Sequence, residues 1–148
     1  MQIREAMTPD VHTIAPTATL RQAAMAMAAT DTGALPVAEG DRLVGMLTDR
    51  DIVIRAVAAG KGPDTTVGEA MSSEIKYCFE DQELDEVREN MGDLQVRRLP
   101  VVNRDKRLVG IVSLADIASW DDAAGAGEAL EEITRPGGAH NQSLEGRA

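Results

Sequence analysis

The hydrophobic positions of this chain follow the same succession of patterns twice. In each half, a short apolar segment precedes a stretch with apolar residues at helical spacing, such as Leu20, Ala23 and Met27. Two short runs of aliphatic and β-branched residues follow, which is typical of strands bounded by turns. A second helix then begins at Asp49 in the first half and at Leu114 in the second. The pattern predicts the order β-α-β-β-α, present twice.

The two halves are copies of one sequence, at an offset of 64 residues that becomes 65 after residue 104. The segment IREAMTP (3–9) resembles VGEAMSS (67–73), and both Leu-Pro-Val and RLVG occur in each half in the same order. Self-similarity at a fixed period indicates a repeated structural unit. The chain therefore divides into a first repeat over 1–60, a linker over 61–66, a second repeat over 67–120 and an acidic tail over 121–148.

Local signals refine the expected elements of each repeat. We expect the first strand at 12–14 and at 76–79, with Thr19 or Asp81 capping the helix that follows. A short polar side chain at such a position can accept a hydrogen bond from a free amide of the first helical turn.

Three further features carry structural expectations. Pro36 and Pro100 lack an amide donor, so each is expected at the start or the edge of a strand. Trp120 closes the second repeat and is expected to pack as an anchor. In the tail, GAGEALEEIT predicts a short helix with Leu130 and Ile133 on one face.

Composition narrows the class of protein. Hydrophobic residues make up 43% of the chain, which is enough for a buried core, and the net charge is -10. An acidic chain is a poor ligand for nucleic acid or an anionic membrane. No apolar run reaches the roughly 20 residues that a membrane span needs, and the first residues do not resemble a signal peptide. With a single cysteine, Cys78, the sequence fits a cytoplasmic protein.

The chemistry of the chain is concentrated in one motif that occurs in both repeats. A strand ends at Thr48 or Ser113, and a carboxylate, Asp51 or Asp116, follows three positions later. Such spacing is typical of a capping box, which needs no ligand. It also suits a ribose phosphate, because the carboxylate can accept from ribose hydroxyls while free helical amides face the phosphate. We favour the ligand, since both motifs use Asp instead of the longer Glu and both follow the same RLVG strand.

The arrangement G-h-h-[ST]-x-x-D after a Leu-Pro-Val strand, repeated once, resembles a pair of CBS domains (the Bateman module). The stretches RLVGMLTDRDIVIRAVAAG and RLVGIVSLADIA are similar to small stand-alone CBS proteins of the hypoxic-response type. The resemblance covers roughly residues 3–120. It implies an α/β (α+β) fold of two repeats packed pseudo-symmetrically through their sheets, a dimeric disk, and an adenine nucleotide such as AMP, ADP or ATP in clefts between the repeats.

The resemblance also assigns roles to residues. Asp51 and Asp116 would hold ribose, and Thr48 and Ser113 would contact ribose or phosphate. Arg50 lies beside the phosphate position of the first motif, where the second motif has an alanine, so we expect the first site to bind better. The residues that would line the adenine slots are Thr13, Leu35 and Pro36 in the first repeat and Tyr77, Leu99 and Pro100 in the second.

Three functions follow from this sequence, in descending order of preference. The first is a regulatory sensor of an adenine nucleotide, with no required cofactor and no catalysis, since no nucleophile–base motif or P-loop occurs. The second is a ligand-independent dimeric assembly module that acts through an unknown protein partner. The third is a redox or metal sensor using Cys78, His12 and His140, which lack the spacing of a metal site; we therefore expect no metal.

Overall fold

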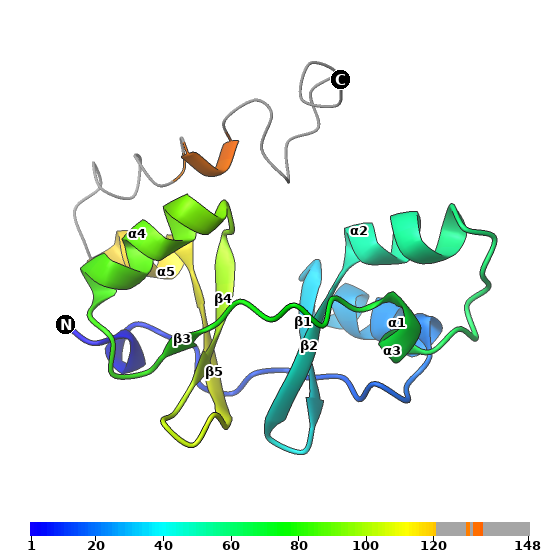
Figure 1. Cartoon of the computed structure of the whole chain (residues 1–148), viewed down its shortest axis with the longest axis horizontal. Coiled ribbons are helices and arrows are strands. Elements are labelled where there is room, and N and C mark those ends of the chain that lie inside the picture. Colours follow the sequence, from blue (N-terminus) through cyan, green and yellow to red (C-terminus); the bar gives the residue numbers. More distant parts are fainter. Residues whose placement is uncertain (121–129, 131, 135–148) are drawn as a thin grey trace. The chain divides into compact units, whose positions relative to one another are not determined.

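Two compact units make up the computed structural model, which describes residues 1–120, 130 and 132–134 (Figure 1). Unit 1 comprises Met1–Asp10, Tyr77–Asp105 and the described residues from Val109 onward, and unit 2 comprises Val11–Lys76 and Lys106–Leu108. Each unit combines helices with one small sheet, which confirms the predicted α/β class. The units are defined by contacts and the repeats by sequence, so the repeat boundaries stay a prediction.

Unit 2 is built on an antiparallel pair of strands with helices around it (Figure 1). Ile14 adds a parallel bridge to Val37. The helix that begins at Asp49 changes from α to π geometry after its first turn. The elements are α1 (Leu20–Thr30), β1 (Ala34–Glu39), β2 (Arg42–Thr48), α2 (Asp49–Asp51), η2 (Ile52–Val57) and α3 (Val67–Ala70).

Unit 1 repeats this plan with a three-stranded sheet in the order β3-β4-β5. The strand β3 runs parallel to β4 and pairs with its last two residues. The elements are η1 (Ile3–Glu5), β3 (Cys78–Phe79), α4 (Leu84–Leu94), β4 (Arg98–Val102), β5 (Leu108–Ser113) and α5 (Leu114–Trp120).

The short lead segments are exchanged between the repeats. Ile3 and Ala6, from the start of the first repeat, belong to the buried cluster of unit 1 together with residues of the second repeat. Val67 and Ala70, from the start of the second repeat, belong to the cluster of unit 2. Each unit therefore combines the body of one repeat with the lead segment of the other.

The shared glycine of the RLVG strand is explained by this exchange. A Cβ on Gly45 would lie 2.7 Å from the Met71 sulfur and 2.8 Å from the backbone oxygen of Ser72. On Gly110 it would lie 2.5 Å from the Met7 sulfur. Real Cβ atoms essentially never approach so closely. In both units, glycine thus lets a lead segment lie directly against the strand.

The expectation that the two prolines lie at a strand start or edge is confirmed for Pro36 and wrong for Pro100. Pro36 is the third residue of β1, opposite Met46, and β1 is an edge strand of its two-stranded sheet. Pro100 lies inside β4, the central strand of its sheet. Met46 exchanges its backbone hydrogen bonds with Ser72 of the lead segment, at 3.0 and 2.8 Å. The backbone N–H and C=O of Met46 both point away from β1. The missing amide of Pro36 therefore leaves no hydrogen-bond partner on β2 unsatisfied.

The helix following the first strand begins as predicted in unit 2. Thr19 Oγ1 accepts from Gln22 N at 3.1 Å and forms a capping box. The strand expected at 12–14 is reduced to an isolated bridge at Ile14, and the one expected at 76–79 is limited to Cys78–Phe79.

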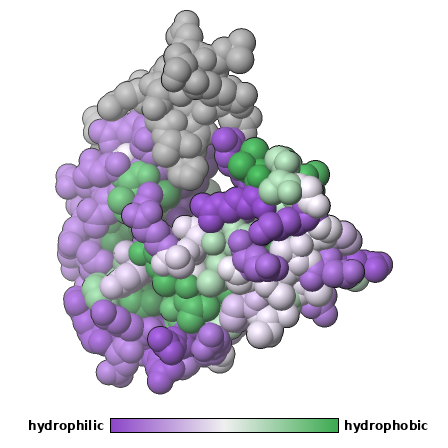
Figure 2. All heavy atoms as spheres, turned by 45° about the vertical axis from the view of Figure 1, so that its right-hand side comes forward, coloured by the Kyte–Doolittle hydropathy of each residue, from purple (hydrophilic) through white to green (hydrophobic). Residues whose placement is uncertain are grey.

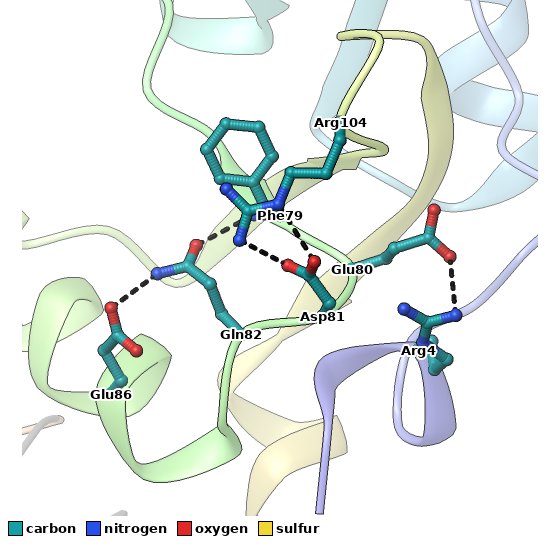
Figure 3. Close-up of polar contacts among 7 residues, drawn as sticks. All are labelled: Arg4, Phe79, Glu80, Asp81, Gln82, Glu86 and Arg104. Atoms are coloured by element: carbon teal, nitrogen blue, oxygen red, sulfur yellow. Dashed lines mark hydrogen bonds and ion pairs between the residues drawn. The ribbon is translucent and has the colours of Figure 1, made fainter.

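Asp81 does not cap α4, contrary to expectation. The N-cap residue is Glu83, and Asp81 instead accepts two hydrogen bonds from Arg104, at 2.9 and 2.7 Å (Figure 3). The hydrogen bond from Arg104 lowers the pKa of the Asp81 carboxyl. The same guanidinium stacks on Phe79, 4.1 Å from the ring centroid. The strong partner across the loop displaces the weaker local cap.

The C-terminal end of the described chain differs in part from the sequence-based expectations. Trp120 is 60% exposed and does not pack as an anchor. Of the predicted tail helix, residue 130 and residues 132–134 are described and helical, and Ile133 is buried in the core of unit 1. Gln95 Nε2 donates to the backbone oxygen of Glu132 at 2.8 Å. The rest of the tail lies outside the described residues.

Hydrophobic side chains also reach the surface among hydrophilic ones, as the space-filling view shows (Figure 2). In unit 2, three of them follow one another along η2: Val53, Ile54 and Val57 are 55%, 53% and 67% exposed. No helix among the described residues is long and apolar enough to span a membrane.

Candidate functional site

The motif of unit 2 is a closed capping box at the end of β2. Thr48 N donates to Asp51 Oδ2 at 2.9 Å, and Asp51 N donates to Thr48 Oγ1 at 3.1 Å. Thr48 has extended backbone geometry, which ends the strand and starts α2. The structure thus confirms the capping interpretation of the spacing. One carboxylate oxygen of Asp51, Oδ1, is not part of the box.

A backbone hydrogen bond connects this motif to the residue before β1. Asp49 N donates to Gly33 O at 2.8 Å. A Cβ on Gly33 would lie only 2.7 Å from Asp49 Oδ2, so the glycine makes room for this carboxylate. The Asp49 side chain turns to its own helix and accepts from Arg50 N at 2.8 Å. The start of α2 is therefore held by the loop that precedes β1.

The predicted slot residues of the first repeat all lie in unit 2 with this motif. Leu35 is 1% exposed and belongs to the core cluster, and Pro36 is buried beside it. Ile14 N donates to Pro36 O at 3.1 Å, which brings the neighbouring Thr13 alongside β1. Because the side chain of Leu35 is buried in the core, a ligand at this position would contact mainly the backbone of β1.

Unit 1 reproduces the same geometry at the end of β5. Ser113 N donates to Asp116 Oδ2 at 2.9 Å, and Asp116 N donates to Ser113 Oγ at 3.0 Å. Leu114 N donates to Arg97 O at 2.8 Å, as Asp49 does to Gly33 in unit 2.

The predicted slot residues of the second repeat lie in unit 1 as well. Leu99 is 1% exposed and belongs to its core cluster, and Pro100 is buried in the same strand. Tyr77 is 38% exposed and meets Phe79 edge-to-face, with ring centroids 5.6 Å apart. Each unit therefore contains all the site residues that were predicted for one repeat.

The two motifs differ in the charges around the same backbone frame. In unit 2 the helix carries Arg50, which is exposed, and Arg55, whose Nε lies 3.9 Å from Asp51 Oδ1. At the matching positions of unit 1 the residues are Ala115 and Trp120. The sequence-based prediction missed Arg55, although an acid followed by a base four positions later on a helix signals such a pair.

The described side chains of the third alternative, a redox or metal sensor, belong to different units. No group of three His, Cys, Asp or Glu side chains among them could hold a metal ion. Cys78 is 1% exposed, and burial raises the pKa of its thiol to about 12, which suppresses the reactive thiolate. His12 is exposed in unit 2, whereas Cys78 belongs to unit 1, and His140 lies outside the described residues.

The fold and the paired motifs define a tandem CBS module, and comparison with known families agrees. The CBS domain model matches residues 3–57 and 67–122. The chain therefore belongs to the CBS domain family.

Comparison with individual proteins shows similar sequences and folds. The chain is 46% identical over 117 residues to hypoxic response protein 1 of Mycobacterium tuberculosis, covering 78% of this chain and 81% of the relative. A crystal structure of hypoxic response protein I with two coordinated zinc ions matches with a TM-score of 0.75 and 44% identity, covering 82% of this chain and all of that one. The resemblance to stand-alone CBS proteins is confirmed.

A CBS domain pair of protein MJ0100, solved with 5-methylthioadenosine and S-adenosyl-L-methionine, matches with a TM-score of 0.71. Its identity is 28%, and the match covers 80% of this chain and 94% of that one. Tandem CBS modules of this fold thus include one that binds adenosine derivatives.

Proposed function

We propose that this protein is a regulatory module that binds an adenine nucleotide of the AMP, ADP or ATP type and catalyses no reaction. The observation that carries the proposal is the pair of matching motifs, in which the capping box engages only one carboxylate oxygen of Asp51 and of Asp116. An ionised carboxylate accepts hydrogen bonds through both oxygens. The second oxygen can therefore accept from ribose hydroxyls without opening the helix cap.

The adenine base would lie against β1 in unit 2 and against β4 in unit 1. In unit 2 this is the backbone around Thr13, Leu35 and Pro36, and in unit 1 the backbone around Leu99 and Pro100 with the half-exposed ring of Tyr77. The adenosine derivatives bound by the CBS pair of MJ0100 support a ligand of this class. The name of the hypoxic response relative supports a role in a stress response.

Regulation requires that the ligand change the equilibrium between two states of the module. A ligand that binds both states equally tightly shifts nothing. We expect the shifted state to be recognised by a protein partner in the cytoplasm, because the module itself contains no P-loop or nucleophile–base motif.

The experiment that tests the ligand is thermal unfolding of nucleotide-stripped protein against AMP, ADP, ATP and S-adenosylmethionine. A ligand that binds only the folded state, at 100 times its Kd, adds about 2.7 kcal/mol to the free energy of unfolding and raises Tm by several degrees. Inosine monophosphate serves as a matched control for the base. No shift with any adenine compound would remove the proposal and leave both motifs as helix caps.

We also propose that the protein is a homodimer that associates through η2. A chain with a net charge of -10 repels its copy. The exposed part of η2 offers Val53, Ile54 and Val57 and no acidic side chain, so two copies can meet there without like-charged carboxylates. Light scattering on Val57→Glu tests this: the variant is expected to be monomeric, and an unchanged dimer would place the contact elsewhere. The matched control, Met25→Glu, adds the same charge to the exposed face of α1.

A further inference from the structure

Arg55 is held at two points beside the proposed ribose-binding carboxylate of unit 2. Its Nε lies 3.9 Å from Asp51 Oδ1, and its Nη1 donates to the backbone oxygen of Met71 at 3.0 Å. The side chain of Asp51 is 18% exposed and that of Arg55 is 50% exposed. The guanidinium is thus fixed by the lead segment on one side while its other side remains open to solvent.

The two oxygens of Asp51 have different surroundings. Oδ2 accepts from Thr48 N at 2.9 Å and closes the helix cap. Oδ1 is the oxygen next to Arg55, so a ribose hydroxyl that donates to Oδ1 lies next to the guanidinium. A ligand anchored on this oxygen is therefore bound within the field of Arg55.

Unit 1 offers no equivalent cation on its motif helix. The residue that matches Arg55 is Trp120, and α5 contains Asp116 but no lysine or arginine. Within the described part of the chain, no ion pair involves Asp116. Asp116 would thus hold a ribose without a positive charge from its own helix.

The charge balance of unit 2 indicates what this cation does. The first turn of its motif helix carries Asp49 and Asp51, and two carboxylates repel an anionic ligand. Arg50 and Arg55 offset them, and Arg55 is the one in contact with the motif carboxylate. We propose that Arg55 is the specificity-determining residue of unit 2: it positions the Asp51 carboxylate and selects a ligand that carries a phosphate over the bare nucleoside. This inference rests on the proposed function, in which Asp51 binds ribose.

Calorimetric titration of the full chain with AMP and with adenosine tests this role. In Arg55→Gln, the affinity for AMP is expected to fall about fivefold to tenfold while that for adenosine changes less than about twofold, because only AMP carries the charge that Arg55 attracts. Glutamine removes the charge and keeps a flexible polar side chain at this position. Arg55→Lys retains a cation one helical turn from Asp51 and is expected to keep most of the preference for AMP.

The matched control is Arg21→Gln, which removes an exposed arginine from α1 and changes the net charge by the same amount. An equal loss for AMP and adenosine in Arg55→Gln, or the same loss in Arg21→Gln, would overturn the role of Arg55. If Asp51→Asn binds both compounds as tightly as the wild type, the proposed ribose site fails, and the inference fails with it. Loss of both ligands in Asp51→Asn with an unchanged AMP preference in Arg55→Gln would reject Arg55 alone.

Discussion

The two units carry the same motif in nearly identical backbone geometry and surround it with different side chains. Both capping boxes close with hydrogen bonds between 2.9 and 3.1 Å, and in both the next helical amide donates, at 2.8 Å, to the residue just before β1 or β4. Around that frame, unit 2 has Arg50 and Arg55 where unit 1 has Ala115 and Trp120. The frame is thus a property of the helix cap, and the charge around it is set by the side chains that each helix carries.

The units also share an exchanged lead segment. Ile3 is fully buried in unit 1 and Val67 is fully buried in unit 2, each next to the body of the other repeat. Neither repeat therefore completes its own core. We expect the stability of each unit to depend on the segment it receives.

The largest expected effect comes from breaking this exchange. Ile3→Ala is expected to cost about 3 kcal/mol in the free energy of unfolding, because it leaves a cavity in a fully buried position. Hydrogen exchange is expected to accelerate at the amides of Thr8 and Ile111, which pair in unit 1, and to change less at Met46 and Ser72 in unit 2. Val67→Ala is the matched variant with the opposite pattern. Acceleration of the unit 2 amides by Ile3→Ala would contradict the exchange.

The next effect concerns the glycines under the lead segments. Gly45→Ala and Gly110→Ala are each expected to cost about 1–3 kcal/mol in urea unfolding, since the added Cβ meets a backbone oxygen that cannot move aside. Gly62→Ala is the control, because a Cβ there meets nothing within 4 Å. A neutral Gly110→Ala would show that Met7 and Thr8 do not lie against β5.

A smaller effect tests the equivalence of the two frames. Thr48→Ala and Ser113→Ala each remove the side-chain oxygen that caps a helix, and each is expected to cost about 1 kcal/mol in the absence of ligand. Thermal unfolding of both variants, with Thr17→Ala as an exposed control, measures this. A cost confined to one motif would mean that the frames are not equivalent.

The smallest effect is a pH dependence found in unit 1 alone. The pKa of Asp81 is lowered by Arg104, so Asp81 contributes stability above its usual pKa of about 3.9, and this contribution is lost as the pH falls below that value. Asp81→Asn is therefore expected to flatten the decline of Tm below about pH 4. Thr17, the equivalent position of unit 2, has no carboxyl, and Thr17→Asn is expected to leave the profile unchanged. If Tm of Asp81→Asn declined with falling pH as steeply as Tm of the wild type, the ion pair of Asp81 with Arg104 would be contradicted.

Much of the fold could be predicted because it depends on local sequence. The cap at Thr19 and the boxes at Thr48 and Ser113 follow from residues within one helical turn. The repeat offset located the main strands and helices.

The remainder depends on contacts between distant residues, which the pattern does not encode. The two lead segments are so similar that the sequence does not reveal which sheet each one joins. Asp81 was expected to cap a helix, but its carboxylate instead accepts hydrogen bonds from Arg104, 23 residues away. Pro100 was expected at a strand start or edge and lies instead inside the central strand of its sheet.

The most direct test of the account is calorimetric titration of AMP into the wild type, Asp51→Asn and Asp116→Asn. Asparagine keeps an oxygen for the helix cap and removes the charge that would hold the ribose. The account predicts that Asp51→Asn loses most AMP binding, about tenfold or more in Kd, while Asp116→Asn retains the tighter site. Loss of binding in Asp116→Asn with intact binding in Asp51→Asn would contradict it and assign the nucleotide to unit 1.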